Sequence, residues 1–302
     1  MIKAKVLADS INDNNVRITT FELEYPRFFH SEFMTHRMLS RNSSSSRAIP
    51  VEKMLEEIDR NPAAPSHWGK NQAGMQAKEE LDGPDLQAAK DIWNEAKREA
   101  ISNARAMHQV KAHKQIVNRI TEPFQNIKVV ATATDWENFF WLRDHADAQP
   151  EIMLLAKAMR HALDESIPER LYPGEWHVPY VEVSRDEQAV RRYYDDIGKE
   201  IPVATALMIS ASCCAQVSYR KTDTSPEKAE VIFRRLIESE PCHASPVEHQ
   251  ALAFDTKACI SHSPVTWHKG VTHVDRNGIL WSGNFRDWIQ YRQLIPNNSK
   301  KG

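Results

Sequence analysis

The densest group of chemically capable side chains lies between residues 35 and 47, where the sequence is THRMLSRNSSSSR. Four serines bracketed by arginines offer hydroxyls, turn amides and guanidinium groups, which suit a phosphate or a dinucleotide. The same residues are also typical of a solvated serine-rich loop after a helix whose C-terminus is stabilised by His36 and Arg37. The residue types alone leave both interpretations open.

Two later segments carry further candidates. Arg119 stands in KQIVNRITEPF, and the segment NFFWLR holds Asn138 and Arg143. On a helix, an asparagine and an arginine five residues apart can line opposite sides of one pocket wall. An ordinary helix in which Arg143 pairs with Asp144 or Asp147 explains the same residues equally well.

Histidines and cysteines are the next residues to weigh, because they bind metals and act as nucleophiles. Five of the 13 histidines fall between residues 243 and 273, beside Cys242 and Cys259, but their intervals of 6, 13, 6 and 5 match no zinc motif. We therefore expect no metal site. The four cysteines contain no C-x-x-C pair, so we expect reduced, buried thiols.

Composition excludes several function classes. No two of the nine glycines have the spacing of a Rossmann fingerprint or a Walker loop, and a formal net charge of −2 gives no global attraction to nucleic acid or anionic membranes. The N-terminal MIKAKVLADS lacks the apolar core of a signal peptide, which predicts a cytoplasmic location. The uncharged run 201–219 contains several polar residues, so we predict a buried helix there and no membrane span.

Hydrophobic spacing indicates the elements that must position these residues. The segment 16–25 (VRITTFELEY) alternates apolar and polar residues and predicts a strand, after which Pro26 opens a predicted helix to about Met38. The small polar residues that follow favour turns. Apolar residues three and four apart predict a long amphipathic helix from Pro84 and another over 150–164.

Two more elements complete the expected architecture. A helix begins at TSPEKAEVIFRRLI, where Thr224 and Glu227 have capping-box spacing, and 247–254 resembles a short strand. The sequence therefore predicts an α+β fold, in which a mostly helical chain packs on a small mixed sheet.

In their order along the chain, the chemical segments resemble the flavin-dependent thymidylate synthases, the ThyX family. Its signature R-H-R, seven residues and a serine is similar to Thr35-His36-Arg37, residues 38–44 and Ser45. QIVNRITEP resembles the family segment E-x-A-R-x-x-L-P, and NFFWLRDHADAQPEI resembles N-F-L-x-L-R…A-Q-x-E-I.

The order of two other family elements is unusual. AQVSYRK (215–221) and HASPVEHQALAF (243–254) are similar to elements that the family carries before its signature, yet here they stand near the C-terminus. The resemblance therefore implies one ThyX-like catalytic domain over residues 1–302, circularly permuted so that the family's N-terminal elements lie at about 211–256.

The resemblance also implies the chemistry. Enzymes of this family are homotetramers with sites between subunits, bind FAD, take reducing equivalents from NADPH, and transfer a one-carbon unit from methylenetetrahydrofolate to C5 of dUMP. They use no cysteine nucleophile, in agreement with four cysteines that show no activating pattern. The partners expected are thus a nucleotide, a folate and further copies of the chain, with no nucleic acid and no membrane.

By matched position, the resemblance assigns Arg143 and Ser45 to catalysis, with Arg143 facing the pyrimidine. The residues expected to bind the substrate, most of them its phosphate, are Glu32, Ser45, Ser46, Arg47, Arg119 and Arg143. The residues expected to hold FAD are His36, Arg37, Asn42, Ser43, Asn138, Ser218 and His249.

Departures from the family pattern leave the substrate open. Thr35, Thr132 and Thr134 replace cationic or amide groups on the flavin side, while Glu32 and Asp147 place carboxylates where the family has a glutamine and a histidine. A carboxylate accepts a hydrogen bond from the cytosine 4-amino group, so methylation or hydroxymethylation of dCMP is an alternative to dUMP. A non-enzymatic helical nucleic-acid-binding protein is disfavoured by the near-neutral charge.

Overall fold

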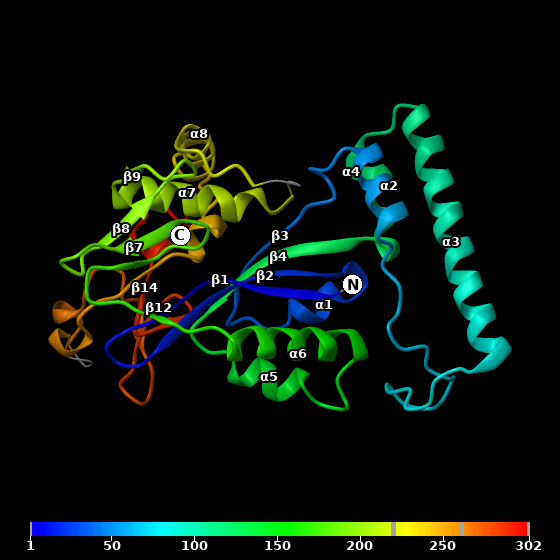
Figure 1. Cartoon of the computed structure of the whole chain (residues 1–302), viewed down its shortest axis with the longest axis horizontal. Coiled ribbons are helices and arrows are strands. Elements are labelled where there is room, and N and C mark those ends of the chain that lie inside the picture. The colour runs from blue at the N-terminus through cyan, green and yellow to red at the C-terminus, as the bar shows by residue number, and fades with distance from the viewer. Residues whose placement is uncertain (1, 219–221, 260–262, 301–302) are drawn as a thin grey trace.

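The computed structural model describes residues 2–218, 222–259 and 263–300, and a five-stranded sheet lies at its centre (Figure 1). The strands are β1 (Lys3–Ile11), β2 (Arg17–Pro26), β3 (Ser40–Ser43), β4 (Asn126–Ala133) and β5 (Glu169–Arg170), in the order β3-β4-β2-β1-β5. Every neighbouring pair is antiparallel except β1 with β5, which is parallel. The sheet is therefore mixed, and the predicted α+β class is confirmed.

One face of this sheet is covered by helices α1 (His30–Phe33), α5 (Glu137–Arg143) and α6 (Pro150–Asp164). Alternate β2 residues Phe21, Leu23 and Tyr25 are fully buried, and they share a core with Ile152 and Leu155 of α6. Both the period-two strand and the helix over 150–164 match their predictions, because each buries a continuous apolar face against the other.

A separate helical group lies at one end of the sheet, on the right in Figure 1. It consists of α2 (Val51–Arg60), α3 (Gly83–Gln109) and α4 (Lys114–Val117). Leu55 and Ile58 of α2 pack against Ala104 of α3 and Val117 of α4 in a core of their own. The long helix predicted from Pro84 is confirmed as α3.

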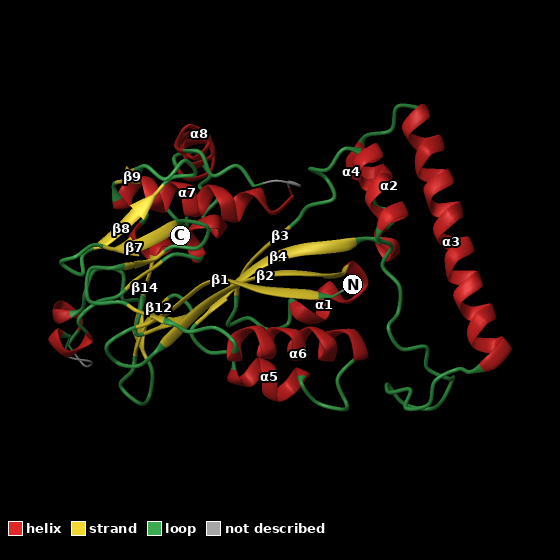
Figure 2. Cartoon of the chain, viewed as in Figure 1, coloured by secondary structure: helices red, strands yellow, loops and turns green. Residues whose placement is uncertain are grey.

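The described residues after β5 form two α-helices and three small sheets at the other end, where Figure 2 shows short strands between helices and loops. The two helices are α7 (Val203–Ala215) and α8 (Pro226–Ile237), and the single-turn helices η3 (Gln216–Ser218) and η4 (Ser245–Glu248) lie in the same part of the sequence. The strands are β6 (Trp176–His177), β7 (Glu182–Arg185), β8 (Arg191–Tyr194), β9 (Glu200–Ile201), β10 (Ala251–Leu252), β11 (His273–Val274), β12 (Leu280–Ser282), β13 (Phe285–Arg286) and β14 (Ile289–Gln290). Further single-turn helices are η1 (Arg27–Phe29), η2 (Glu122–Phe124), η5 (Thr256–Ala258), η6 (Pro264–Thr266) and η7 (Tyr291–Leu294).

The predicted helix from Pro26 to Met38 is wrong beyond Phe33. The Thr35 hydroxyl donates to the carbonyl of Glu32 at 2.7 Å, and the Arg41 guanidinium donates to the carbonyl of Met34 at 2.8 Å. These side chains take carbonyls that a longer helix would use for its own backbone bonds, so the helix stops there.

Three other local predictions need correction. The strand expected over 247–254 shrinks to β10, because its first residues belong to the single-turn helix η4 and only Ala251 and Leu252 pair with other strands. The first part of the serine-rich segment pairs with β4 as β3, and only residues 44–47 lie outside that strand as expected. Helix α8 is capped by Ser225, whose side chain accepts from the amide of Lys228, and not by Thr224.

The run 201–219 folds mainly as the buried helix α7, as predicted, while Tyr219 lies outside the described residues. Among the helices that the structure describes, none is long and apolar enough to cross a membrane.

Candidate functional site

Two polar clusters lie at opposite ends of β3. The first, which we call the loop cluster, consists of Ser44–Arg47 together with Arg27, Arg119 and Glu122. Oε1 of Glu122 accepts hydrogen bonds from the Ser46 hydroxyl at 3.3 Å and from the Arg119 guanidinium at 3.1 Å. The Arg27 guanidinium lies 3.5 Å from the same oxygen. One carboxylate thus faces two guanidinium groups, and the excess positive charge suits a phosphate.

The backbone of this loop is held by neighbouring elements. The Ser45 amide donates to Oγ of Ser218 in η3 at 2.9 Å, and the Asn118 amide group donates to the Ser46 carbonyl at 2.7 Å. Arg47 is exposed and bonds to no other residue in the described part of the chain. The structure therefore brings Ser45, Ser46 and Arg119 together and leaves Arg47 on the surface.

A cavity of about 790 Å³ opens beside the loop cluster. Its lining includes Ser44 and Ser218, and it also includes Lys3, Lys53 and Lys128. This volume lies within the usual range for small-molecule pockets. The serine-rich loop thus borders a space that could accept a phosphorylated small molecule.

The second cluster, which we call the arginine cluster, precedes β3 and consists of Glu32, Thr35, His36 and Arg143. Nε of Arg143 donates to Nε2 of His36 at 2.8 Å, and Nη2 donates to the Thr35 hydroxyl at 3.3 Å. Burial, reinforced by the charge of Arg143, lowers the pKa of His36 to about 4. His36 is therefore neutral at pH 7 and can accept the bond.

Glu32 lies within the electrostatic influence of Arg143 without bonding to it. Its Oε2 is buried and has no hydrogen-bond partner among the described residues. Burial raises the pKa of Glu32, although the charge of Arg143 opposes the shift. Asp147 differs, because its side chain is 70% exposed and its nearest ion-pair partner is His145 at 3.8 Å. Of the two carboxylates that depart from the family pattern, only Glu32 belongs to the arginine cluster.

The residues expected to hold FAD differ in how far their side chains are exposed. Arg37, Ser43 and Asn138 are exposed, and their side chains make no hydrogen bond within the described ranges. The side-chain amide of Asn42 donates to the Cys214 carbonyl at 3.1 Å. Guanidinium, hydroxyl and amide donors are the groups that a pyrophosphate and the polar edge of a flavin require. This donor set fits FAD.

His249 ends a chain of buried hydrogen bonds that crosses the central sheet. Its Nδ1 lies 2.8 Å from the Thr132 hydroxyl, which lies 2.8 Å from that of Thr20. Thr20 lies 2.8 Å from Nε2 of His177, whose Nδ1 lies 2.9 Å from the Ser10 hydroxyl. Burial lowers the pKa of both histidines to about 3, so both are neutral. Nε2 of His249 is buried without a partner among the described residues.

No group of three or more metal-binding side chains occurs in the described residues, from which His262 is missing. Cys213 and Cys214 are buried, as predicted, whereas Cys242 and Cys259 are partly exposed. Burial raises the pKa of Cys213 to about 12, so its thiol stays protonated at neutral pH.

Arg27, Asn118 and Glu122 were not predicted as site residues. Glu122 follows Arg119 by three residues, so an i, i+3 ion pair was the one available signal. Arg27 reaches the cluster only because β2 pairs with β4, with Pro26 opposite Asn126, and no local pattern reports that pairing.

A family model described as "Thymidylate synthase complementing protein" matches residues 16–169, about half of the chain. A search of curated proteins finds no match.

Two solved structures of a UMP/dUMP methylase, PolB from Streptomyces cacaoi, are similar to part of the chain. The complex with 5-Br UMP has a TM-score of 0.47 and 17% sequence identity, and covers 55% of this chain and 89% of that one. The complex with 5-Br dUMP has a TM-score of 0.44 and 15% identity, and covers 55% of this chain and 91% of that one. Similarity at this level assigns no substrate to the present chain.

Proposed function

The chain belongs to the family of the thymidylate synthase complementing protein, and we propose on that basis that it is an FAD-dependent thymidylate synthase. Family membership supports an enzyme of the methyltransferase type that acts on a pyrimidine nucleotide. In the proposed reaction, a one-carbon unit passes from methylenetetrahydrofolate to C5 of dUMP, and dTMP is formed. The observation that carries the proposal is that the family match includes Arg119, Arg143 and the whole serine-rich motif.

The loop cluster binds the nucleotide phosphate in this proposal. Arg119 and Ser46 already converge on one carboxylate oxygen of Glu122, so they are held where they can bind an anion. Ser45 contributes its hydroxyl, since its amide is already bonded to Ser218. Arg47 adds a further guanidinium from the surface. Charge-assisted bonds of this kind are about twice as strong as neutral ones.

The arginine cluster acts on the base. A neutral histidine and a hydroxyl hold Arg143, so its positive charge is not neutralised by a bonded carboxylate. A fixed guanidinium stabilises negative charge that develops on the pyrimidine ring as C5 becomes nucleophilic. This assignment makes Arg143 the principal catalytic residue, with His36 and Thr35 orienting it.

FAD would be held by Arg37, Ser43, Asn42 and Asn138, with Ser218, His36 and His249 nearby. When bound, FAD supplies the hydride, originally from NADPH, that completes the methyl group. The exposed donors suit the pyrophosphate and the ring edge, whereas the buried His249 has one ring nitrogen without a partner.

A complete site calls for more than one copy of the chain, because the two clusters lie at opposite ends of β3. In a twofold assembly, the loop cluster of one copy can face the arginine cluster of another. A twofold gives a dimer, and we propose a homotetramer with sites between subunits because the family resemblance implies one.

We also propose that residues 1–302 form one catalytic domain with a rearranged order of elements. Contacts from the late segment 211–256 support this idea, since Cys214 and Ser218 bond to the segment around β3, and His249 bonds to β4. These residues can therefore occupy the place of the family's N-terminal elements.

A second candidate substrate is dCMP, and Glu32 is the observation that favours it. An ionised carboxylate beside Arg143 would accept a hydrogen bond from the cytosine 4-amino group and would repel uracil O4. A protonated carboxyl would instead donate to uracil O4. Burial raises the pKa of Glu32 while the charge of Arg143 opposes the shift, so the choice between the two substrates depends on which form of Glu32 faces the base.

The test is to incubate the purified protein with FAD, NADPH, methylenetetrahydrofolate and either dUMP or dCMP, and to weigh the products. We expect dTMP, whose base is heavier than uracil by one methyl group. Reactions without folate serve as controls. Absence of both a nucleotide product and flavin absorbance after reconstitution would overturn both candidates.

A further inference from the structure

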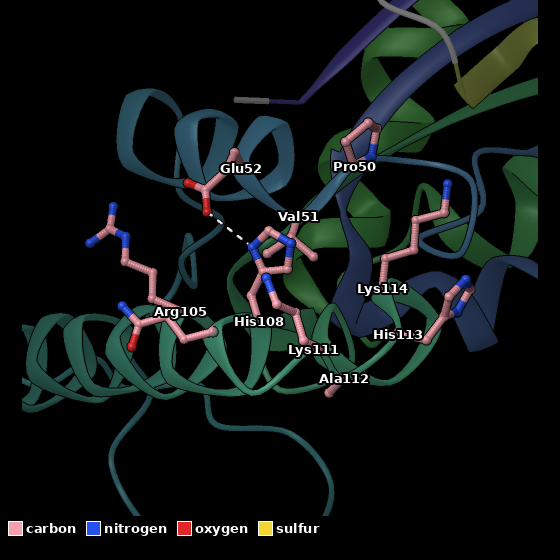
Figure 3. A pocket seen from close by; sticks show the side chains of 10 residues that line it. Pro50, Val51, Glu52, Arg105, His108, Lys111, Ala112, His113 and Lys114 are labelled. Carbon is pink, nitrogen blue, oxygen red and sulfur yellow. Dashed lines mark hydrogen bonds and ion pairs between the residues drawn. The ribbon is translucent and has the colours of Figure 1, made fainter.

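We propose that a second anion site, independent of the loop and arginine clusters, lies where α2, α3 and α4 meet and binds a small molecule with two or more phosphate groups. Figure 3 shows this pocket, which has a volume of about 710 Å³. Its lining includes Arg105, Lys111 and Lys114, together with two histidines, against the single carboxylate of Glu52. The excess of positive charge in a concave space is the electrostatic requirement for a polyanion.

The backbone at Lys111 gives the proposal a second, independent observation. Lys111 has a φ of +66°, in the left-handed region that is unfavourable for residues other than glycine. Its amide donates to the His108 carbonyl at 3.0 Å, and the next amide donates to the Met107 carbonyl at 3.1 Å, which is a Schellman ending of α3. Glycine is the usual residue at this position. A lysine there places a cation at the pocket at the cost of backbone strain.

The basic side chains that line this pocket do not all serve to stabilise the C-terminus of α3 through its helix dipole. The carbonyls of Met107 and His108 are already satisfied by the Schellman bonds. Lys114 comes from a different helix, and its ammonium donates to the Ala48 carbonyl at 3.0 Å. The cations therefore come from separate elements and line the same pocket.

The arrangement favours an extended polyphosphate over a single phosphate. Arg105 lies four residues before the end of α3 at Gln109, which corresponds to about 6 Å along the helix axis, and Lys111 lies two residues beyond that end. Figure 3 shows Arg105 and Lys114 at opposite ends of the group of side chains. A bound anion could replace the present ion-pair partners of these side chains. Arg105 lies 3.6 Å from an exposed Asp59, and His108, which is itself exposed, lies 3.3 Å from Glu52. Exposed ion pairs of this kind contribute little free energy.

The probe for this site is inorganic triphosphate, titrated into the full chain by calorimetry at about 0.15 M salt, where exposed charges are screened beyond roughly 8 Å. Saturable binding is expected, and Arg105→Ala should weaken it at least about tenfold, the scale of one charge-assisted hydrogen bond. Lys157→Ala, which removes an exposed lysine on α6, is the matched control and should bind as wild type does.

Lys111→Gly separates loss of the site from loss of the fold. Glycine suits a φ of +66°, so this variant should melt at or above the wild-type temperature and yet bind triphosphate at least about tenfold more weakly. The double variant Arg47→Ala, Arg119→Ala should retain triphosphate binding, which distinguishes this pocket from the loop cluster. The proposal is overturned by absence of saturable binding, by wild-type affinity in both pocket variants, or by loss of binding in the double variant.

Discussion

The two clusters at the ends of β3 hold their arginines in opposite ways. In the loop cluster the carboxylate of Glu122 lies between Arg27 and Arg119, so an incoming phosphate must share or displace an existing anion. In the arginine cluster Arg143 bonds to a neutral imidazole and a hydroxyl, and its charge remains available. The first arrangement suits reversible binding, whereas the second suits stabilisation of charge that exists only during reaction.

Removing Arg143 should have the largest effect of any single change. Arg143→Ala is expected to lower kcat by about 10²–10³, the scale observed when one preorganised donor to a developing negative charge is lost. Single-turnover formation of dTMP, followed by mass spectrometry, measures it. Arg143→Lys retains a charge but not the planar donor geometry, and should recover only part of the rate. Turnover of the alanine variant at the wild-type rate contradicts the catalytic assignment.

Removing an arginine from the loop cluster should affect binding more than rate. Arg119→Ala and Arg47→Ala are each expected to weaken dUMP binding by about 1.5–3 kcal/mol, or about ten- to 150-fold. Equilibrium titration with dUMP checks this, and flavin content should change less. Lys157→Ala again serves as the control. If both arginine variants bind dUMP like wild type, the phosphate does not lie in the loop cluster.

Changing Glu32 should alter the preference of the enzyme between uracil and cytosine nucleotides. An unpaired group at a base edge changes discrimination by about 1–3 kcal/mol, which corresponds to roughly a five- to 150-fold preference. We expect a wild type that prefers dUMP, with Glu32→Gln changing the ratio of kcat/KM for dUMP and dCMP. Asp147→His is the matched comparison and should alter the ratio less, because Asp147 is exposed. A wild type active only on dCMP would establish the alternative substrate.

Acidification should destabilise the fold through its neutral histidines. The folded-state pKa of His36 is about 4, below its ordinary value of 6.5, and that of His177 and of His249 is about 3. Above pH 6.5 the three histidines are neutral in the folded and the unfolded chain, so their contribution to the free energy of unfolding is fully present. Below pH 6.5 these histidines bind protons in the unfolded chain but stay neutral in the folded chain. The free energy of unfolding therefore falls by up to about 1.4 kcal/mol per pH unit for each histidine.

Urea unfolding at pH 7 and pH 5 measures this loss. His36→Gln keeps an acceptor for Arg143 and should flatten the dependence on pH. His161→Gln, which changes an exposed histidine, should not alter it. Equal pH dependence in the wild type and both variants would show that His36 is not among the histidines that cause it.

The smallest effect is expected from the cysteines. Replacing all four with serine or alanine should leave turnover measurable, provided that the variant folds, because the proposed chemistry uses no thiolate. The raised pKa of Cys213 agrees with this expectation. A covalent adduct between a cysteine and the pyrimidine, detected by mass spectrometry, would contradict it.

Elements with a single strong periodicity could be predicted from the sequence. Helix α6 begins and ends at the expected residues, and β2 alternates as expected, because each buries one regular apolar face. Endings set by a distant side chain could not be predicted. Helix α1 stops early partly because Arg41, eight residues after Phe33, bonds to a carbonyl at its end.

The proposed site could be read from the sequence only where its residues lie in local motifs. Family resemblance names Ser46, Arg119 and Arg143, and their hydrogen bonds in the two clusters support the anion-binding and charge-stabilising roles that we propose for them. Glu122 and Arg27 depend on strand pairing across about a hundred residues of sequence, which leaves no periodic signal. The division between the clusters was likewise unpredictable, since it depends on the short strand that separates them.

The series of buried side chains from Ser10 to His249 is joined by four hydrogen bonds, and its five members carry one hydroxyl or imidazole hydrogen each. Ser10, Thr20 and Thr132 each bring one hydroxyl hydrogen, and each neutral imidazole brings one on nitrogen. If every bond points toward His249, the surplus hydrogen lies on its Nε2. If every bond points the other way, the surplus lies on Ser10, and Nε2 of His249 offers a lone pair. The tautomer of His249 is therefore fixed by the orientation of a hydroxyl on β1, at the other end of the chain.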